Sequence, residues 1–424
     1  MKHLFPDGPK KILIISSWAP PMIGGPQSLY NVFSQFPKDS YSILTSYNII
    51  WDTQKSNVSG SWLPCKYYFF DHKGEINGGS VKILTASKNV NIAKKVFDFF
   101  KALPVFNLIV ISALLVYSIF STTKKTITIS KQNKFNMLLG LSDIGYALIS
   151  TYFAHKITKI PYALYIFDVY KGYKFELPYK FLASLFEKVI FKNAKIIIVT
   201  NKATEDLYKK RYGDSLNIKI IHNSVFTDAY DKIRVERHIT APYKIIFTGY
   251  VYWAQEQSLL NLIKAMEQLI DLPVELLIYS PKPTDAIRNS IVNKNNIKLL
   301  SANQSEIPKI QNEATLLFLP LSWNTNAPAI ITTATPGKYT DYLASGRPML
   351  VHAPDYAYVS QYTKENQLGL VVDKNDIQLL ADTIRNFIKY PGNGQNYVNN
   401  ALKIFYQNHD AKKNAKKLAK LLEI

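Results

Sequence analysis

Short apolar runs alternate with helical segments along almost the whole chain, and this alternation restricts the fold more than any other feature of the sequence. The first half contains such runs at residues 11–17, 41–46, 66–71, 135–141, 162–167 and 195–200. The second half contains them at residues 243–249, 274–280, 296–300, 315–321, 348–352 and 368–373. Helical patterns, such as 257–270 and 376–388, lie between them. Strands that alternate with helices are typical of βα units, so the sequence predicts an α/β protein with parallel sheets.

The chain is too long for a single domain of this kind. It has 424 residues, and single hydrophobic cores stop growing well below that size. A run at 218–226, followed by the polar stretch 227–240, marks a domain junction. We therefore predict doubly wound domains over residues 1–225 and 226–400, with their sheets facing one cleft. The C-terminal segment, residues 401–424, contains an amphipathic helical pattern over residues 410–422.

Composition and charge limit the classes of protein to which this chain can belong. The chain is 47% apolar and has one cysteine, Cys65, which excludes a disulfide framework and offers no zinc cluster. The N-terminal apolar run is too short for a signal segment, so we expect a cytoplasmic protein. Residues 1–225 hold 29 Lys and Arg against 13 Asp and Glu, whereas residues 226–424 hold 22 against 18. A basic first half favours an anionic partner, either nucleic acid or lipid; a solubilising lysine-rich surface is the alternative.

The segment 336–348 has the features of a phosphate-binding helix start. Pro336 and Gly337 end the preceding segment, residues 339–344 can form two helical turns, and Gly346 stops them. A helix N-terminus binds phosphate readily, and Lys338 adds a cation there. Asp341, one turn later, suits ribose hydroxyls. The segment therefore suggests a nucleotide-diphosphate site, with an ordinary βα crossover as the alternative.

Two loops of the first half carry further candidate site residues. Gly24 and Gly25 follow the first strand, where glycines let backbone approach a ligand closely. The spacing is not that of a nicotinamide-binding loop. Asp168 follows the run 162–167, so we expect it at the carboxyl edge of the sheet, where catalytic groups collect. A tight turn at the glycines and a helix N-cap at Asp168 are the alternatives.

These motifs occur in an order that resembles the family 4 glycosyltransferases of the GT-B fold, and the resemblance covers nearly the whole chain. The matching stretches are the Pro-Pro-x-x-Gly-Gly loop 20–25, residues 160–168, the junction 220–225, Phe-Thr-Gly at 247–249 and residues 336–348. No single motif is specific, but five in the family's order are. The resemblance implies a GT-B architecture in which the last helix returns to the first domain.

The resemblance also implies a retaining, hexosyltransferase-type enzyme that moves a sugar from a nucleotide diphosphate to an acceptor hydroxyl without a metal or other cofactor. The glycine loop and Asp168 would lie at the reaction centre. The residues that would hold the nucleotide sugar are Gly249, Thr333, Thr335, Pro336, Gly337, Lys338 and Asp341.

Three departures from the family pattern concern the donor site. The family commonly has an acid eight residues before Asp341, where this chain has Thr333. The Arg and Lys that usually follow the Phe-x-Gly strand are replaced by the stretch 250–256, which contains neither residue type. A His-Asp pair common in the first domain is Phe167-Asp168 here. The sequence thus supports the diphosphate end of the site better than the sugar end.

The most hydrophobic segment, residues 103–120, permits two interpretations. It is either a buried helix that covers the first sheet or a helix that rests in a membrane interface beside basic side chains. We favour the second, and predict a bacterial enzyme at the inner membrane face that acts on a lipid-linked or saccharide acceptor. No nucleic-acid motif is present, so no nucleic-acid partner is expected. The alternatives are a nucleotide-sugar epimerase of the same fold, or an inactive basic membrane- or nucleic-acid-binding protein.

Overall fold

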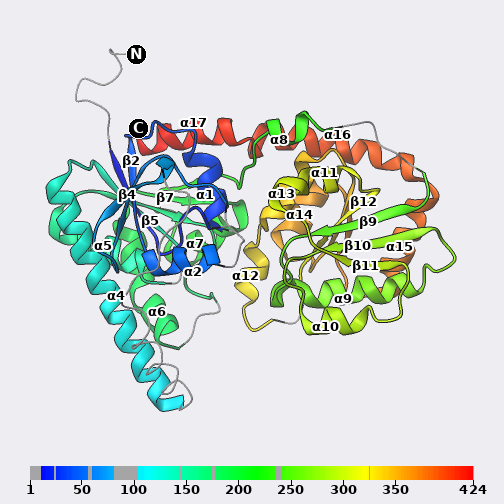
Figure 1. Cartoon of the computed structure of the whole chain (residues 1–424), viewed down its shortest axis with the longest axis horizontal. Coiled ribbons are helices and arrows are strands. Elements are labelled where there is room, and N and C mark those ends of the chain that lie inside the picture. Colours follow the sequence, from blue (N-terminus) through cyan, green and yellow to red (C-terminus); the bar gives the residue numbers. More distant parts are fainter. Residues whose placement is uncertain are drawn as a thin grey trace. The chain divides into compact units, whose positions relative to one another are not determined.

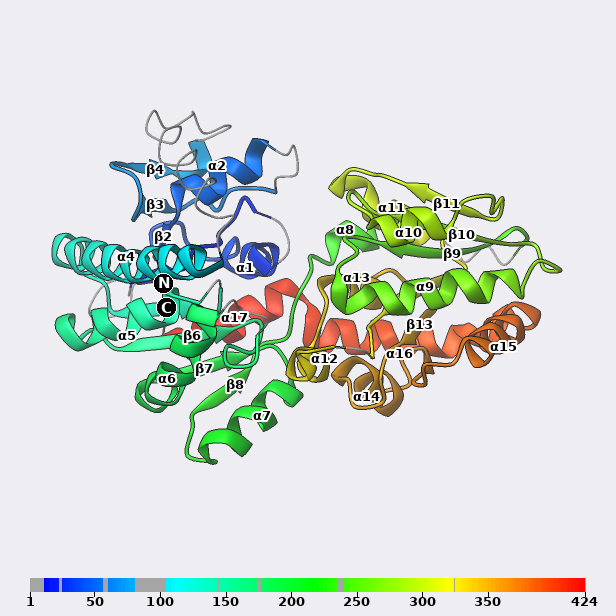
Figure 2. The ribbon, with the colours of Figure 1, turned by 90° about the horizontal axis from the view of Figure 1, so that it is seen from below.

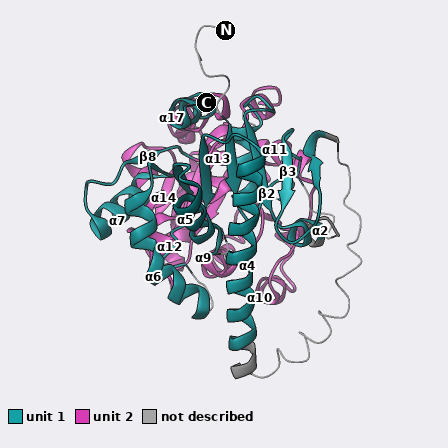
Figure 3. Cartoon of the chain, turned by 90° about the vertical axis from the view of Figure 1, so that its left-hand side faces the viewer, with its two compact units in different colours: residues 1–222, 414–424 teal, residues 223–413 magenta. Residues whose placement is uncertain are grey.

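The computed structural model divides into two compact units, each built on its own parallel sheet (Figures 1 and 3). It describes residues 11–22, 25–55, 60–80, 104–143, 145–173, 177–234, 240–323 and 325–423. Unit 1 comprises residues 1–222 and 414–424, and unit 2 comprises residues 223–413. Unit 2 begins three residues before the predicted start of the second domain at residue 226. The chain returns to unit 1 at residue 414, thirteen residues after the predicted start of the C-terminal segment at residue 401.

Unit 1 contains an eight-stranded sheet in the order β4-β3-β2-β1-β5-β6-β7-β8. All neighbouring strands pair in parallel except β3 and β4, which are antiparallel. The strands are β1 Ile12–Ile15, β2 Tyr41–Thr45, β3 Lys66–Phe69, β4 Glu75–Asn77, β5 Met137–Leu141, β6 Tyr162–Ile166, β7 Ile196–Val199 and β8 Ile218–Ile220. The sequence predicts six of these. The short strands β4 and β8 are additions at the two edges.

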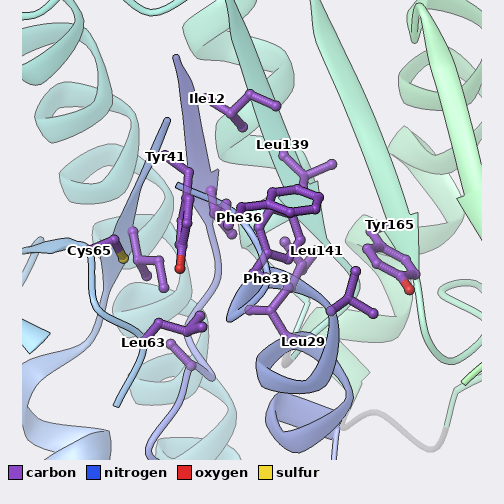
Figure 4. Close-up of a cluster of buried hydrophobic side chains, with 14 of the residues drawn as sticks. Ile12, Leu29, Phe33, Phe36, Tyr41, Leu63, Cys65, Leu139, Leu141 and Tyr165 are labelled. Carbon is purple, nitrogen blue, oxygen red and sulfur yellow. The ribbon is translucent and has the colours of Figure 1, made fainter. Parts of the chain in front are cut away.

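Helices cover both faces of this sheet. They are α1 Gly25–Phe33, α2 Tyr47–Lys55, α4 Pro104–Gln132, α5 Ala147–Thr158, α6 Leu177–Asn193, α7 Lys202–Tyr212 and α17 Ala411–Leu422. Alternate residues of β1 belong to the two cores on opposite faces of the sheet. Ile12 and Ile14 belong to one core, and Leu13 and Ile15 belong to the other. Figure 4 shows the first of these cores, where Leu29 and Phe33 of α1 pack with strand residues. Such near-continuous apolar strands are required in a sheet buried on both faces.

Unit 2 contains a six-stranded, fully parallel sheet in the order β11-β10-β9-β12-β13-β14. The strands are β9 Tyr243–Thr248, β10 Val274–Tyr279, β11 Ile297–Leu300, β12 Leu316–Pro320, β13 Met349–His352 and β14 Leu370–Val372. Each lies within a predicted run. The order of a dinucleotide-binding sheet, 3-2-1-4-5-6, results when β9 is counted as the first strand.

The helices of unit 2 are mostly short. They are α8 Asp228–Asp231, α9 Trp253–Glu267, α10 Asp285–Ser290, α11 Ile307–Asn312, α12 Pro328–Thr333, α13 Gly337–Ala344, α14 Tyr358–Glu365, α15 Ile377–Lys389 and α16 Gln395–Ile404. Helix α13 is the predicted helix of the 336–348 segment. Gly346 ends it in the left-handed region, with φ +71°.

The two ends of unit 2 are joined by the backbone. Val225 and Asp410 form a parallel bridge, in which the Val225 amide donates to the His409 carbonyl at 3.1 Å. The Ala411 amide donates in turn to the Val225 carbonyl at 3.1 Å. After this bridge the chain re-enters unit 1, where Leu418 and Leu422 of α17 are buried in the core.

Candidate functional site

In unit 2 the predicted site residues gather at the point where the strand order reverses. Strand β9 lies between β10, which follows it in the chain, and β12, which lies on its other side. Ligands of open parallel sheets bind outside the carboxyl ends of the strands at such a reversal. Gly249 directly follows β9, and Lys338 of α13 reaches the same place.

Lys338 is held by three neighbours. Its Nζ donates to Gln255 Oε1 at 3.0 Å and lies 3.8 Å from the centre of the Phe247 ring. Gly249 has φ +110°, and a Cβ at this position would lie 3.2 Å from Lys338 Cε. The backbone conformation therefore favours glycine here, and a Cβ would also displace the end of the Lys338 side chain.

Asp341 belongs to a hydrogen-bond network beneath Lys338. Tyr230 Oη donates to Asp341 Oδ1 at 2.8 Å and lies 3.1 Å from Gln311 Oε1. Gln311 Nε2 donates to Thr248 Oγ1 at 3.0 Å, which connects the carboxylate to the end of β9. The network fixes the Asp341 side chain and leaves it partly exposed.

Burial acts on both charged groups of this site. It lowers the pKa of Lys338 well below its usual range, although the Asp341 carboxylate opposes the shift. It raises the pKa of Asp341 to about 6, and here the Tyr230 hydroxyl and Lys338 oppose the shift. Both residues keep some solvent contact, which limits these effects. For each group, desolvation has a larger effect on the pKa than the attraction between the two charges. A phosphate bound beside Lys338 would add a negative charge there and so favour the charged form of the lysine.

The residues just before Lys338 form the entry to α13. Pro336 occupies the N-cap and supplies no side-chain acceptor to the first turn, and Gly337 is exposed. The Thr335 carbonyl accepts from Asn223 Nδ2 at 2.9 Å. Thr333, at the position of the family's acid, is buried at the end of α12, and its Oγ1 donates to the Ala329 carbonyl at 2.8 Å. Thr333 is thus engaged with its own helix.

Unit 1 has a hollow at the corresponding reversal of its own sheet, between β1 and β5. Its lining residues follow three strands: Trp18 follows β1, Ser142 and Asp143 follow β5, and Asp168, Val169, Tyr170 and Tyr173 follow β6. Ser142 Oγ accepts from the Phe167 amide at 2.9 Å, which ties the two loops together. Asp168 therefore lies where its position after the fifth apolar run, 162–167, predicts.

The two carboxyl groups of this hollow differ in their surroundings. Asp143 is buried and accepts from the Ser17 amide and, at 3.1 Å, from the Gly145 amide. Burial raises its pKa, and these bonds oppose the shift. Desolvation raises the pKa of Asp168 to about 6, although the residue is exposed on one side, where water limits the effect. A carboxyl with such a pKa can exchange a proton near neutral pH.

The glycine loop is only partly described. Gly25 is exposed and begins α1, and a Cβ there would meet no other atom within 4 Å. Gly24 lies outside the described residues. In the parts of the chain that the structure describes, no group of three or more His, Cys, Asp or Glu could hold a metal ion.

Sequence reasoning did not identify several residues of these sites. Gln255 lies in the stretch that lacks the family's Arg and Lys, and Tyr230 lies in the polar stretch assigned to the junction. Asp143 comes two residues after the predicted strand 135–141, and Asp168 directly follows the predicted strand 162–167. Position after a strand could therefore have indicated Asp143. No signal pointed to Gln255 or Tyr230, since a long-range hydrogen bond leaves no local pattern.

Comparisons with known proteins agree with this architecture. Residues 242–389 match the family model described as glycosyl transferases group 1. HepE of Anabaena, solved in complex with UDP, aligns with 13% identity over 97% of this chain and 99% of its own, with a TM-score of 0.65. The sucrose-phosphate synthase of Thermosynechococcus elongatus aligns with 11% identity over 98% of each chain, also with a TM-score of 0.65. MurG of Acinetobacter baumannii aligns with 12% identity and a TM-score of 0.53, over 98% of this chain and 99% of its own. No curated protein sequence matches. The predicted GT-B fold is confirmed.

Proposed function

We propose that this chain, whose residues 242–389 match the model of glycosyl transferases group 1 and whose fold is that of the GT-B enzymes, transfers a sugar from a nucleotide diphosphate to an acceptor hydroxyl with retention of configuration. The observation that carries the proposal is the position of Lys338 beside Gly249 at the strand reversal of unit 2. The HepE structures, which contain UDP or UDP-glucose, support a donor of this class.

The proposed donor site binds the diphosphate through charge and backbone. Lys338 would contact a phosphate oxygen, and the amides at the start of α13 would face the same group. Asp341, already oriented by Tyr230, would accept from ribose hydroxyls. Breaking the bond between the sugar and its phosphate leaves negative charge on the diphosphate. Lys338 and the helix N-terminus are placed to stabilise that charge as it develops.

In unit 1, we assign the hollow to the acceptor and the reacting sugar. Asp168 is the carboxyl group of the hollow that reaches solvent, and Asp143 is engaged with backbone amides. Asp168 would bind a sugar or acceptor hydroxyl. In retaining GT-B enzymes the departing phosphate is thought to take the acceptor's proton, and we propose the same here. A metal is not part of this proposal, since Lys338 and α13 supply the positive charge.

The donor site is tested by isothermal titration and thermal shift with UDP-, GDP-, ADP- and TDP-sugars. We expect one nucleotide to raise the unfolding temperature, since a ligand that binds the folded state stabilises it. Lys338→Ala should weaken binding by at least about tenfold, because a phosphate contact to a charged group is lost. Lys264→Ala is the matched control, since Lys264 is an exposed lysine of α9 in the same unit. Equal affinities of the wild type and Lys338→Ala would overturn the placement.

The reaction is tested with the nucleotide sugar so identified. Nuclear magnetic resonance of the product should show the anomeric configuration of the donor, and chelators should leave the rate unchanged. Asp168→Asn should lower kcat while leaving donor affinity unaltered. Release of an epimerised nucleotide sugar without transfer would assign the epimerase alternative instead. Salt-sensitive nucleic-acid binding without nucleotide-sugar binding would assign the inactive-scaffold alternative.

We further propose that the acceptor is a saccharide or a lipid-linked saccharide of bacterial surface polysaccharide or glycolipid synthesis, and that the enzyme works at the cytoplasmic face of the membrane. The basic balance of residues 1–225 supports an anionic membrane surface. Nucleic acid is not a proposed partner. Incubation with a membrane extract and the labelled donor should place the label in the lipid fraction.

A further inference from the structure

Helix α4 has an apolar outer stripe that the described residues of unit 1 leave exposed. Ile109, Val116 and Phe120 are 59%, 63% and 64% exposed and follow one another at roughly helical repeats. The opposite face packs inward, since Leu115 is buried and Ile119 packs against the core of unit 1. A helix that is apolar on all sides is buried on all sides or faces lipid. Helix α4 is therefore not the fully buried helix that one interpretation of the sequence predicts.

The exposed stripe changes from apolar to polar and basic along the helix. After Phe120 the same line of positions continues through Lys124, Thr128 and Lys131, all of them exposed. The apolar part, residues 109–120, is about 16 Å long at the rise of an α-helix. That length is about half of the ~30 Å hydrocarbon core of a bilayer. By length and composition the described part of α4 could span a membrane, with a mean hydropathy of 1.4, but its inner face packs on the sheet. The length of the stripe therefore matches the thickness of one leaflet.

Helix α6 repeats the pattern independently. Leu177, Phe181 and Leu185 are 71%, 67% and 59% exposed, and the same stripe continues through the exposed lysines Lys188 and Lys192. The two helices contact each other, and Figure 2 shows both on one side of unit 1. Each precedes a strand of the parallel part of the sheet, α4 before β5 and α6 before β7. Both therefore begin at the carboxyl edge, and their apolar halves lie toward that edge.

The charge of this surface has one sign. Helices α4, α5 and α6 carry Lys124, Lys125, Lys131, Lys156, Lys180, Lys188 and Lys192. Their one acid is Glu187, which is buried and bound by Arg211 and Tyr212. Across these three helices, as far as the structure describes them, no carboxylate is exposed. Such a surface complements phosphate headgroups.

We propose that the apolar halves of α4 and α6, residues 108–120 and 177–185, insert into one leaflet of an anionic bilayer, with the lysines at its headgroups. The proposal deepens the membrane-face part of the proposed function and rests on it. Tyr173 of the Asp168 hollow precedes Leu177 by four residues. The docked bilayer therefore adjoins the hollow, which suits an acceptor whose lipid tail stays in the membrane while its hydroxyl reaches Asp168.

A site-specific fluorescent label tests the insertion directly. The one native cysteine, Cys65, is 2% exposed, so a cysteine introduced on the surface can be labelled selectively. Tyr117, 62% exposed, lies beside the stripe in the apolar half of α4, so Tyr117→Cys places an environment-sensitive dye there. Ile270→Cys places the dye on a residue of unit 2 that is also exposed. Vesicles of three parts phosphatidylcholine to one part phosphatidylglycerol should shift the emission of the first to the blue and leave the second unchanged. No shift at position 117, or an equal shift with pure phosphatidylcholine, would overturn the proposal.

Vesicle sedimentation tests the contribution of the surface. Val116→Ser/Phe120→Ser should reduce the partition coefficient by about tenfold or more, whereas the matched control Ile270→Ser/Val292→Ser should not change it. Lys124→Ala and Lys188→Ala should each lower the partition coefficient about fivefold, and only on anionic vesicles. If the double serine variant dissociates a dimer on size exclusion and vesicle binding is unaltered, a second copy covers the stripe and the proposal fails. Lys338→Ala should bind vesicles like the wild type, which separates this test from that of the donor site.

Discussion

Asp341, a residue of the proposed donor site, makes the stability of the protein depend on pH. Desolvation raises the pKa of its carboxyl to about 6 from an ordinary value near 3.8, although the hydrogen bond from Tyr230 opposes the shift. Between those values the folded protein keeps a proton that the unfolded chain releases. The contribution of this group to stability is therefore complete below about pH 4 and is lost as the pH rises through 6.

We expect Asp341→Asn to remove that dependence. Asparagine can still accept from Tyr230, so the stability of the variant relative to the wild type should rise between pH 4 and 6, by at most about 3 kcal/mol. Urea unfolding across that range, followed by fluorescence, measures it. Tyr230→Phe removes a hydrogen bond that favours the ionised carboxyl, so it should extend the window to higher pH. A difference between Asp341→Asn and the wild type that does not vary with pH would contradict the assignment.

Residues that a local pattern marks could be predicted, and residues that only the fold brings together could not. Gly249, Lys338 and Asp341 each belong to a strand–loop–helix pattern, and Asp168 follows an apolar run. Gln255 holds Lys338 from a different helix, 83 positions away in the chain. Its role depends on tertiary packing, which spacing alone does not encode.

Among the elements, α17 shows how a terminal helix can stabilise a unit distant in sequence. Leu418 and Leu422 are buried in the first core, and Lys195 forms an ion pair with Glu423 just beyond the helix. The exposed ion pair contributes little, so the buried leucines carry the attachment.

Leu418→Ala should destabilise unit 1 by about 2–5 kcal/mol, the range for a buried leucine replaced by alanine. Thermal or urea unfolding of the full chain would report it. Lys416→Ala, on the exposed face of the same helix, should change stability by less than about 0.5 kcal/mol. Equal effects of the two substitutions would show that the helix is not held by its apolar face.

The predicted strands and the observed ones differ where burial is incomplete. The twelve apolar runs became strands because buried parallel strands are almost continuously apolar. Strand β4, Glu75–Asn77, has a polar sequence and pairs antiparallel at an edge, so no apolar run marks it. Strand β8 lies in the stretch assigned to the junction. In α4, hydrophobicity predicted a helix but could not tell which face the sheet covers.

For the whole molecule, the decisive feature is that unit 2 is one continuous segment with its ends joined. The Val225–Asp410 bridge and the bond from Thr227 Oγ1 to Asp410 Oδ2, at 2.6 Å, both lie within this unit. Among the described residues, the core cluster packed around its sheet is formed by residues of unit 2 alone. Such a segment has the properties of a domain that can fold alone.

A fragment of residues 223–413 should therefore fold by itself and bind the donor nucleotide with an affinity within about threefold of that of the full chain. Circular dichroism, a cooperative thermal transition and isothermal titration measure these properties. The same fragment with Lys338→Ala should fold and bind weakly, which separates a failed site from a failed fold. A fragment that shows no cooperative transition would contradict the independence of unit 2.

The joined ends of unit 2 also bear on how such chains can diversify. Recombination at two points, one on each side of the Val225–Asp410 bridge, would exchange the entire unit in one event. The sheet of unit 1, its lysine-rich helices and residues 414–424 of the terminal helix would pass unchanged to the recombinant. Under the proposed assignment of the donor to unit 2 and of the acceptor and the membrane surface to unit 1, such an exchange would bring in a new sugar donor and keep the acceptor and the membrane attachment.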